Sequence, residues 1–89
     1  MKLYASDAKG IQFAIDNLSG STKIKELKQR IIREKNINDE IIIIIDGEPL
    51  GDNDEDKELD DYGLNDQDYI LYIRKYPAGL YQYKDNFIM

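Results

Sequence analysis

The pattern of hydrophobic and polar positions changes its period along the chain, and each period predicts one kind of element. Residues 2–7 and 11–16 alternate between apolar and polar side chains, a period of two that is typical of half-buried strands. Gly10 lies between the two stretches and favours a tight turn, because glycine adopts positive φ without steric cost. The start of the chain is therefore expected to form a β-hairpin. One face of its second strand would carry Ile11, Phe13 and Ile15.

Between residues 23 and 35 the apolar positions recur every three or four residues. Polar and charged side chains occupy the intervening positions, so this stretch is expected to form an amphipathic helix of about three and a half turns. The apolar residues of this pattern are Ile24, Leu27 and Ile31. The preceding loop ends in Ser21 and Thr22, which are residue types that cap helix N-termini. Asn36 suits the C-terminal end, because asparagine tolerates the left-handed conformation.

The second half of the chain predicts three more strands, one of them short. Five consecutive isoleucines, Ile41 to Ile45, strongly favour a strand because β-branched residues pack well on a pleated surface. The pair Asp46–Gly47 is a turn signal that precedes a short return strand. After it come a polar acidic loop over 51–58, a tight turn over 59–64 and a final strand over 69–73.

This order of elements predicts an α+β fold with one sheet and one amphipathic helix packed across it. Because the helix connects the two halves of the chain, the first and last strands can pair in parallel at the centre of the sheet. The expected architecture is therefore the ββαββ β-grasp arrangement.

Several segments resemble the ubiquitin family when they are taken together, in order and at near-correct spacing. They are Ile24–Lys28 with Ile31, Asp46–Leu50, Leu59–Leu64 and the terminal strand. The resemblance implies a ubiquitin-like domain over residues 1–75, followed by a C-terminal extension over 76–89. It also implies a core of Leu3, Ala5, Phe13, Ile15, Leu27, Ile31, Ile43, Leu50, Leu59, Leu64, Ile70 and Tyr72.

Composition narrows the classes of function. The chain contains no histidine and no cysteine, so it lacks the commonest general base, the thiolate nucleophile and the commonest transition-metal ligands. Its net charge of −6 argues against a nucleic-acid backbone or an anionic membrane as the main partner. No apolar run approaches the ~18–20 residues of a membrane span, and the N-terminus does not read as a signal peptide. We expect a cytoplasmic or nuclear protein that is not an enzyme, needs no cofactor and is a monomer when isolated.

Strand parity predicts a binding patch on the outer face of the sheet. If Ile43 points inward to the helix, its two neighbours point outward, and alternate residues of the last strand do the same. The outward residues are then Ile42, Ile44, Leu71 and Ile73. Contiguous exposed apolar surface on a small domain usually marks a partner site. The alternative is that residues 80–89, which are rich in aromatic and aliphatic side chains, cover this face.

The resemblance adds a position for each part of this patch. The central isoleucine of ubiquitin's binding patch falls on Ile44, its neighbouring valine on Ile73 and its loop leucine on Ala8. Arg74 and Lys75 would frame the patch. These matches imply an adaptor-like domain with partners of the ubiquitin pathway, such as proteasomal receptors or ligase components.

Two other functions remain open. Without gaps, ubiquitin's last two glycines fall on Ala78 and Gly79, so a protease that cuts after Gly79 would release a covalent modifier. Pro77 fixes φ, and Ala78 adds a methyl group where a slender chain has to thread an enzyme channel, so both oppose this function. The other possibility is a structural subunit whose sheet is permanently buried in a complex.

The acidic loop is a weak candidate for a metal site. Asp52, Asp54 and Asp56 stand at alternate positions, as in the first half of an EF-hand loop. The sixth position is Lys57 instead of glycine, and the twelfth is Gly63 instead of glutamate. We therefore expect no bound metal and a solvated loop.

Overall fold

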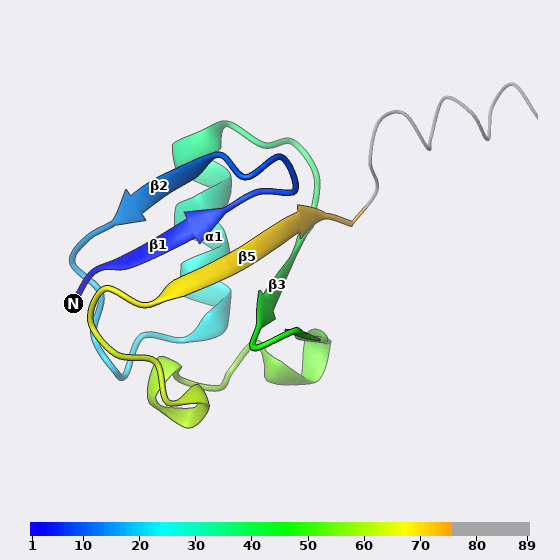
Figure 1. The fold of residues 1–89 in the computed structure, drawn as a ribbon. Helices are drawn as coiled ribbons and strands as arrows, with labels where there is room; N and C mark the ends of the chain where they lie inside the picture. Colours follow the sequence, from blue (N-terminus) through cyan, green and yellow to red (C-terminus); the bar gives the residue numbers. More distant parts are fainter. Residues whose placement is uncertain (76–89) are drawn as a thin grey trace, which may run out of the picture.

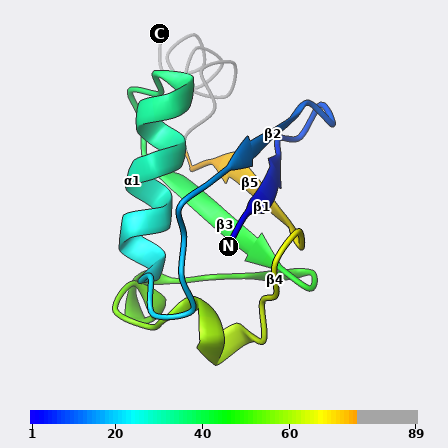
Figure 2. The ribbon, with the colours of Figure 1, turned by 90° about the vertical axis from the view of Figure 1, so that its left-hand side faces the viewer.

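A five-stranded mixed sheet and one long helix form the framework of residues 1–75, which are the residues that the computed structural model describes. The strands are β1 (Leu3–Ser6), β2 (Gln12–Ile15), β3 (Ile41–Ile45), β4 (Glu48–Pro49) and β5 (Tyr69–Arg74), and the helix is α1 (Ile24–Lys35). Two short 3-10 helices follow β4, η1 (Asp52–Asp54) and η2 (Leu59–Tyr62). The helix packs across one face of the sheet (Figure 1, Figure 2), which confirms the predicted α+β, β-grasp-like arrangement.

The two ends of the domain meet at the centre of the sheet. The strand order is β2-β1-β5-β3-β4, and β1 pairs in parallel with β5, as predicted. In this pair Tyr4 lies opposite Tyr69, and Ala5 lies opposite Ile70. All other strand pairs are antiparallel. The parallel pair therefore joins the N-terminal hairpin to the second half of the sheet.

The turn between β1 and β2 is organised by one carboxylate. Asp7 Oδ1 accepts hydrogen bonds from the backbone N–H groups of Lys9 and Ile11, both at 2.9 Å. Ile11 thus belongs to the turn, and β2 begins one residue later. Its side chain is 55% exposed, which agrees with its absence from the predicted core, whereas Phe13 is partly buried and Ile15 is buried.

The turn between β3 and β4 is formed by Asp46 and Gly47. Both have positive φ, 53° and 79°, which is the backbone signature of a type I′ hairpin turn. Ile45 consequently pairs with Glu48, and the two-residue turn fixes how the two strands align.

The helix buries the predicted apolar face. Ile24, Leu27 and Ile31 are fully buried. At the C-terminal end Asn36 adopts the predicted left-handed conformation, and the N–H of Ile37 donates to the carbonyl of Ile32 at 2.9 Å. Within residues 1–75, no helix is long and apolar enough to cross a membrane.

The N-terminus of α1 differs from the prediction that serine and threonine cap it. Lys23 occupies the N-cap position and makes no side-chain capping bond. Instead, the N–H groups of Ile24 and Lys25 donate to the carbonyls of Lys57 and Glu55, at 2.9 and 3.0 Å. The acidic loop therefore supplies backbone acceptors for the first turn of the helix, which no local side chain does.

The hydrophobic core lies between the helix and the inner face of the sheet. All predicted core residues are buried except Phe13, which is partly buried and packs against the core from the edge strand β2. Its ring meets Tyr72 edge-on, with 6.3 Å between the ring centroids. The core also contains Leu18, Ile24, Ile37, Ile41 and Ile45.

Because Ile43 is fully buried, we expect Ile43→Ala to lower the free energy of unfolding by about 2–5 kcal/mol. Ile42→Ala is a matched control, since it removes the same atoms from the partly exposed face of the same strand. Urea denaturation of both variants tests this expectation through the unfolding midpoints. Equal losses would contradict the inward and outward alternation of β3.

Candidate protein-binding surface

The face of the sheet that points away from α1 carries the predicted patch and faces the viewer in Figure 1. Ile42 and Ile44 are partly exposed, whereas the other three isoleucines of β3 are buried. Leu71 and Ile73 are 47% and 39% exposed. The structure thus places the four predicted residues on one face, which no element covers among residues 1–75 (Figure 1, Figure 2).

Strand register brings these four residues together. Ile42 lies directly opposite Ile73, and Ile44 lies directly opposite Leu71, in the antiparallel pair of β3 and β5. Side chains at directly opposed positions contact each other, with Cβ atoms about 4.5–5.5 Å apart. The four side chains therefore form one contiguous apolar quartet.

Two tyrosines that were not predicted from the sequence extend this surface across the parallel pair. Tyr69 is 62% exposed and lies two residues before Leu71, on the same face. Its ring stacks on that of Tyr4, with centroids 5.1 Å apart and planes inclined by 25°. Lys2 Nζ lies 5.8 Å from the Tyr4 ring centroid. The same parity that placed Leu71 outward was sufficient to find Tyr69 in the sequence.

We call this surface the outer patch. It consists of Tyr4, Ile42, Ile44, Tyr69, Leu71 and Ile73.

The remaining predicted residues lie beyond the outer patch. Ala8 is exposed in the β1–β2 turn, where it helps to line a groove together with Tyr72 and Arg74. Lys75 follows β5, and its Nζ lies 3.2 Å from Glu40 Oε2. Its N–H also donates to the carbonyl of Glu40 at 2.9 Å, which anchors the end of the described chain beside the start of β3. Gly79, on which the modifier function depends, lies outside the described residues.

In the acidic loop, two of the three aspartates pair with lysines, and one of these two also accepts a backbone N–H. Asp54 Oδ2 accepts the N–H of Gly51 at 2.9 Å, and Asp54 Oδ1 lies 3.0 Å from Lys57 Nζ. The bond from Gly51, and then that from Lys57, lower the pKa of Asp54. Residues 1–75 contain no cluster of three His, Cys, Asp or Glu side chains that could hold a metal ion.

The same loop is also paired with the helix that it caps. Asp56 Oδ1 lies 3.0 Å from Lys25 Nζ, and Glu55 Oε1 lies 3.1 Å from Lys28 Nζ. The bond from Lys25 lowers the pKa of Asp56 and, reciprocally, raises the pKa of Lys25. Exposed ion pairs of this kind contribute little stability individually. Together with the two backbone bonds to Ile24 and Lys25, they assign the loop a structural role at the helix N-terminus.

No family model matches the chain, and no curated protein is significantly similar to it. The fold and the surface therefore define the class: a small β-grasp-like domain with an open apolar sheet face. Membership of the ubiquitin family stays a prediction from the sequence segments that resemble it.

The aspartate pairs of the loop predict a dependence of stability on pH. The pKa values of Asp54 and Asp56 are lowered in the folded state, so their ionised forms stabilise it above the ordinary carboxyl pKa. This stabilisation is lost as the pH falls through the lowered values, below about pH 4. We expect Asp54→Asn to be less stable than wild type at neutral pH and to lose less stability on acidification.

Urea midpoints at neutral pH and at about pH 3 measure this difference. Asp16→Asn is the control, because it removes the same charge from a residue outside the loop. An Asp54→Asn variant whose midpoint falls as steeply with pH as that of wild type would contradict the expectation.

Proposed function

We propose that this chain is a non-enzymatic ubiquitin-like domain that binds other proteins non-covalently through its outer patch. The observation that carries the proposal is the contiguity of the patch: two directly opposed aliphatic pairs lie beside a stacked tyrosine pair. A half-exposed antiparallel sheet usually carries polar side chains on its solvent face, so six apolar or aromatic residues there call for a partner. Tyrosine is also enriched among the residues that dominate binding energy.

The shape of the patch favours an amphipathic helix as the partner element. The patch spans three neighbouring strands, β1, β5 and β3. The apolar stripe of a helix, with anchors spaced three and four residues apart, matches such a surface. The resemblance to ubiquitin adds the class of partner: receptors or ligase components of the ubiquitin pathway, in the cytoplasm or nucleus.

Charge at the margins adds selectivity to this apolar contact. Lys2 stands beside Tyr4 at one side, and the Glu40–Lys75 pair stands at the end of β5. Rim charges of this kind mainly affect association rate and partner choice, whereas the buried centre of an interface determines affinity. The excess of negative charge on the whole chain favours partners with basic flanks.

The proposal predicts that the patch is required for binding. A panel of synthetic single-helix ubiquitin-receptor motifs, titrated into the isotope-labelled chain, should shift amide signals of β3 and β5 for at least one member. Leu71→Ala should then weaken binding of that peptide about fivefold or more, since central apolar anchors contribute more than about 1 kcal/mol. Ile11→Ala is the control, because Ile11 is equally apolar and 55% exposed but lies outside the patch.

Binding that survives both Leu71→Ala and Ile44→Ala at wild-type affinity would overturn the proposal. The mass of the chain isolated from its native cells separates the modifier function from this one. A native chain that ends at Gly79, joined through that residue to lysines of other proteins, would replace non-covalent binding as the main activity.

A further inference from the structure

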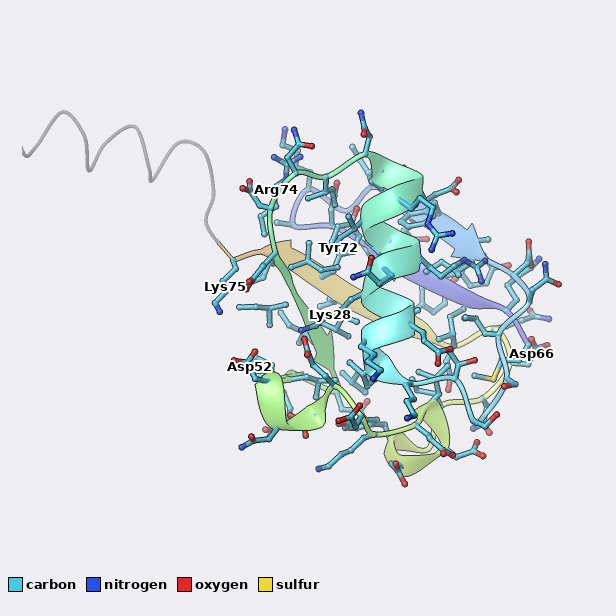
Figure 3. All side chains as sticks on the ribbon, turned by 180° about the vertical axis from the view of Figure 1, so that it is seen from behind. Lys28, Asp52, Asp66, Tyr72, Arg74 and Lys75 are labelled. Atoms are coloured by element: carbon cyan, nitrogen blue, oxygen red, sulfur yellow. The ribbon has the colours of Figure 1, made fainter. Side chains whose placement is uncertain are left out.

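A groove lies at the helix side of the sheet, where the β1–β2 turn, the C-terminal end of α1 and the end of β5 meet. Its volume is about 550 Å³. Ala8, Ile11 and Ile37 give it an apolar lining. Figure 3 shows the molecule from this side, with Arg74 near the C-terminal end of the helix. The groove is separate from the outer patch, since none of the six patch residues lines it.

The charged residues of the groove are mostly cations. Among residues 1–75, Lys9, Lys35 and Arg74 line it, against one carboxylate, that of Asp7. Asp7 Oδ1 is already occupied by two backbone N–H groups of the turn. Within residues 1–75, none of the three cations lies in an ion pair. A local excess of positive charge thus stands on a chain whose net charge is −6.

One of these cations also faces the helix end. Lys35 lies in the last turn of α1, where its charge offsets the partial negative charge of the helix C-terminus. Its Nζ lies 4.6 Å from the centroid of the Phe13 ring, which holds the ammonium group near β2. Lys9 and Arg74, which lie on the turn and on β5, are therefore the cations best placed to meet an anion.

A tyrosine supplies a hydrogen-bond donor in the same groove. Tyr72 lines the groove and is only 5% exposed, yet its hydroxyl forms no hydrogen bond with any of residues 1–75. Burial, and then the charge of Asp7, raise the pKa of Tyr72, while Arg74 lowers it. The hydroxyl is therefore protonated at neutral pH. Among residues 1–75 the fully buried side-chain polar atom without a partner is the Tyr62 hydroxyl, so the Tyr72 hydroxyl reaches the solvent of the groove, where a ligand oxygen can accept its hydrogen bond.

We propose that this groove binds an acidic, apolar peptide segment of a partner protein. A carboxylate of the segment accepts hydrogen bonds from Arg74 and from the Tyr72 hydroxyl, and a neighbouring large apolar side chain packs on Ile11 and Ile37. Bonds between a guanidinium and a carboxylate are short and about twice as strong as neutral ones. The volume lies within the ~300–1,000 Å³ of typical ligand sites and accommodates a few side chains.

The combination of groups favours a peptide over other anions. A free inorganic anion would leave the apolar lining uncovered, and a nucleic acid would meet the overall negative charge of the chain. This contact goes beyond the proposed function, because it uses a different surface and a different chemistry. Each of the two can fail without the other.

The test uses a blocked hexapeptide with three glutamates around a leucine–phenylalanine pair, titrated into the full-length, isotope-labelled chain. We expect shifts of the Ala8, Ile11, Ile37 and Tyr72 amides, and binding that weakens as salt is raised. The same peptide with glutamine in place of glutamate should bind about tenfold more weakly or not at all, which corresponds to the loss of about 1.4 kcal/mol.

Variants of the chain locate the site. Arg74→Gln should weaken the acidic peptide about tenfold, whereas Arg33→Gln, which removes the same charge outside the groove, should leave its affinity unchanged. Tyr72→Phe keeps the buried ring and removes only the hydroxyl, so it should also weaken binding. Amide spectra of each variant without peptide verify the fold.

Four outcomes would overturn the inference. The first is equal binding of the two peptides, and the second is an equal effect of Arg74→Gln and Arg33→Gln. The third is a set of groove shifts that follows the protein concentration instead of the peptide, which would assign the groove to a second copy of the chain. The fourth is a set of groove amide signals that do not respond to the peptide but shift in the Asp85→Asn variant, which would assign the groove to the chain's own C-terminal segment.

Discussion

The parallel pairing of β1 with β5 joins the two ends of the domain, and both surfaces depend on it. It places Ala5 beside Ile70 on the inner face and Tyr4 beside Tyr69 on the outer face. It also brings the β1–β2 turn to the end of β5, where the groove forms. A contact between residues so far apart in sequence closes a long loop, so its entropic cost has to be repaid by the core that the pairing completes. The surfaces are thus properties of the complete fold and of no single element.

The outer patch contains more apolar surface than the fold requires. Inward isoleucines in β3 are sufficient to seal the core, and polar residues at positions 42 and 44 would preserve the alternation that most exposed sheets show. Opposite them on β5, Leu71 and Ile73 are also apolar at positions that face outward. Two adjacent strands that both depart from this rule at facing positions are the basis of the proposed protein contact. The groove is unusual in another way, since it gathers Lys9, Lys35 and Arg74 on a chain whose net charge is −6.

The periodicity of the sequence predicted most of the fold and four of the six residues of the outer patch. Alternation predicted the strands, the three-and-four spacing predicted α1, and parity placed Ile42, Ile44, Leu71 and Ile73 on one side. Periodicity does not predict contacts between segments that lie far apart in the sequence. The carbonyls of residues 55 and 57 that cap the helix come from a loop whose own sequence indicates only solvation. The exposure of Ile11 follows from hydrogen bonds to Asp7, and the groove around Tyr72 exists only where three separate segments converge.

The five isoleucines of β3 have a consequence for how the sheet aligns. A strand normally encodes its own alignment, because a shift by one residue turns its apolar side chains to water and its polar ones to the core. In β3 such a shift would exchange one isoleucine for another, so burial alone would hardly distinguish the correct alignment from a slipped one. The correct alignment of β3 must therefore be set by residues outside the strand. These are Asp46 and Gly47, which have positive φ, and the unlike residues Leu71 and Tyr72 on β5. The Asp46–Gly47 turn thus fixes which isoleucines of β3 face the core.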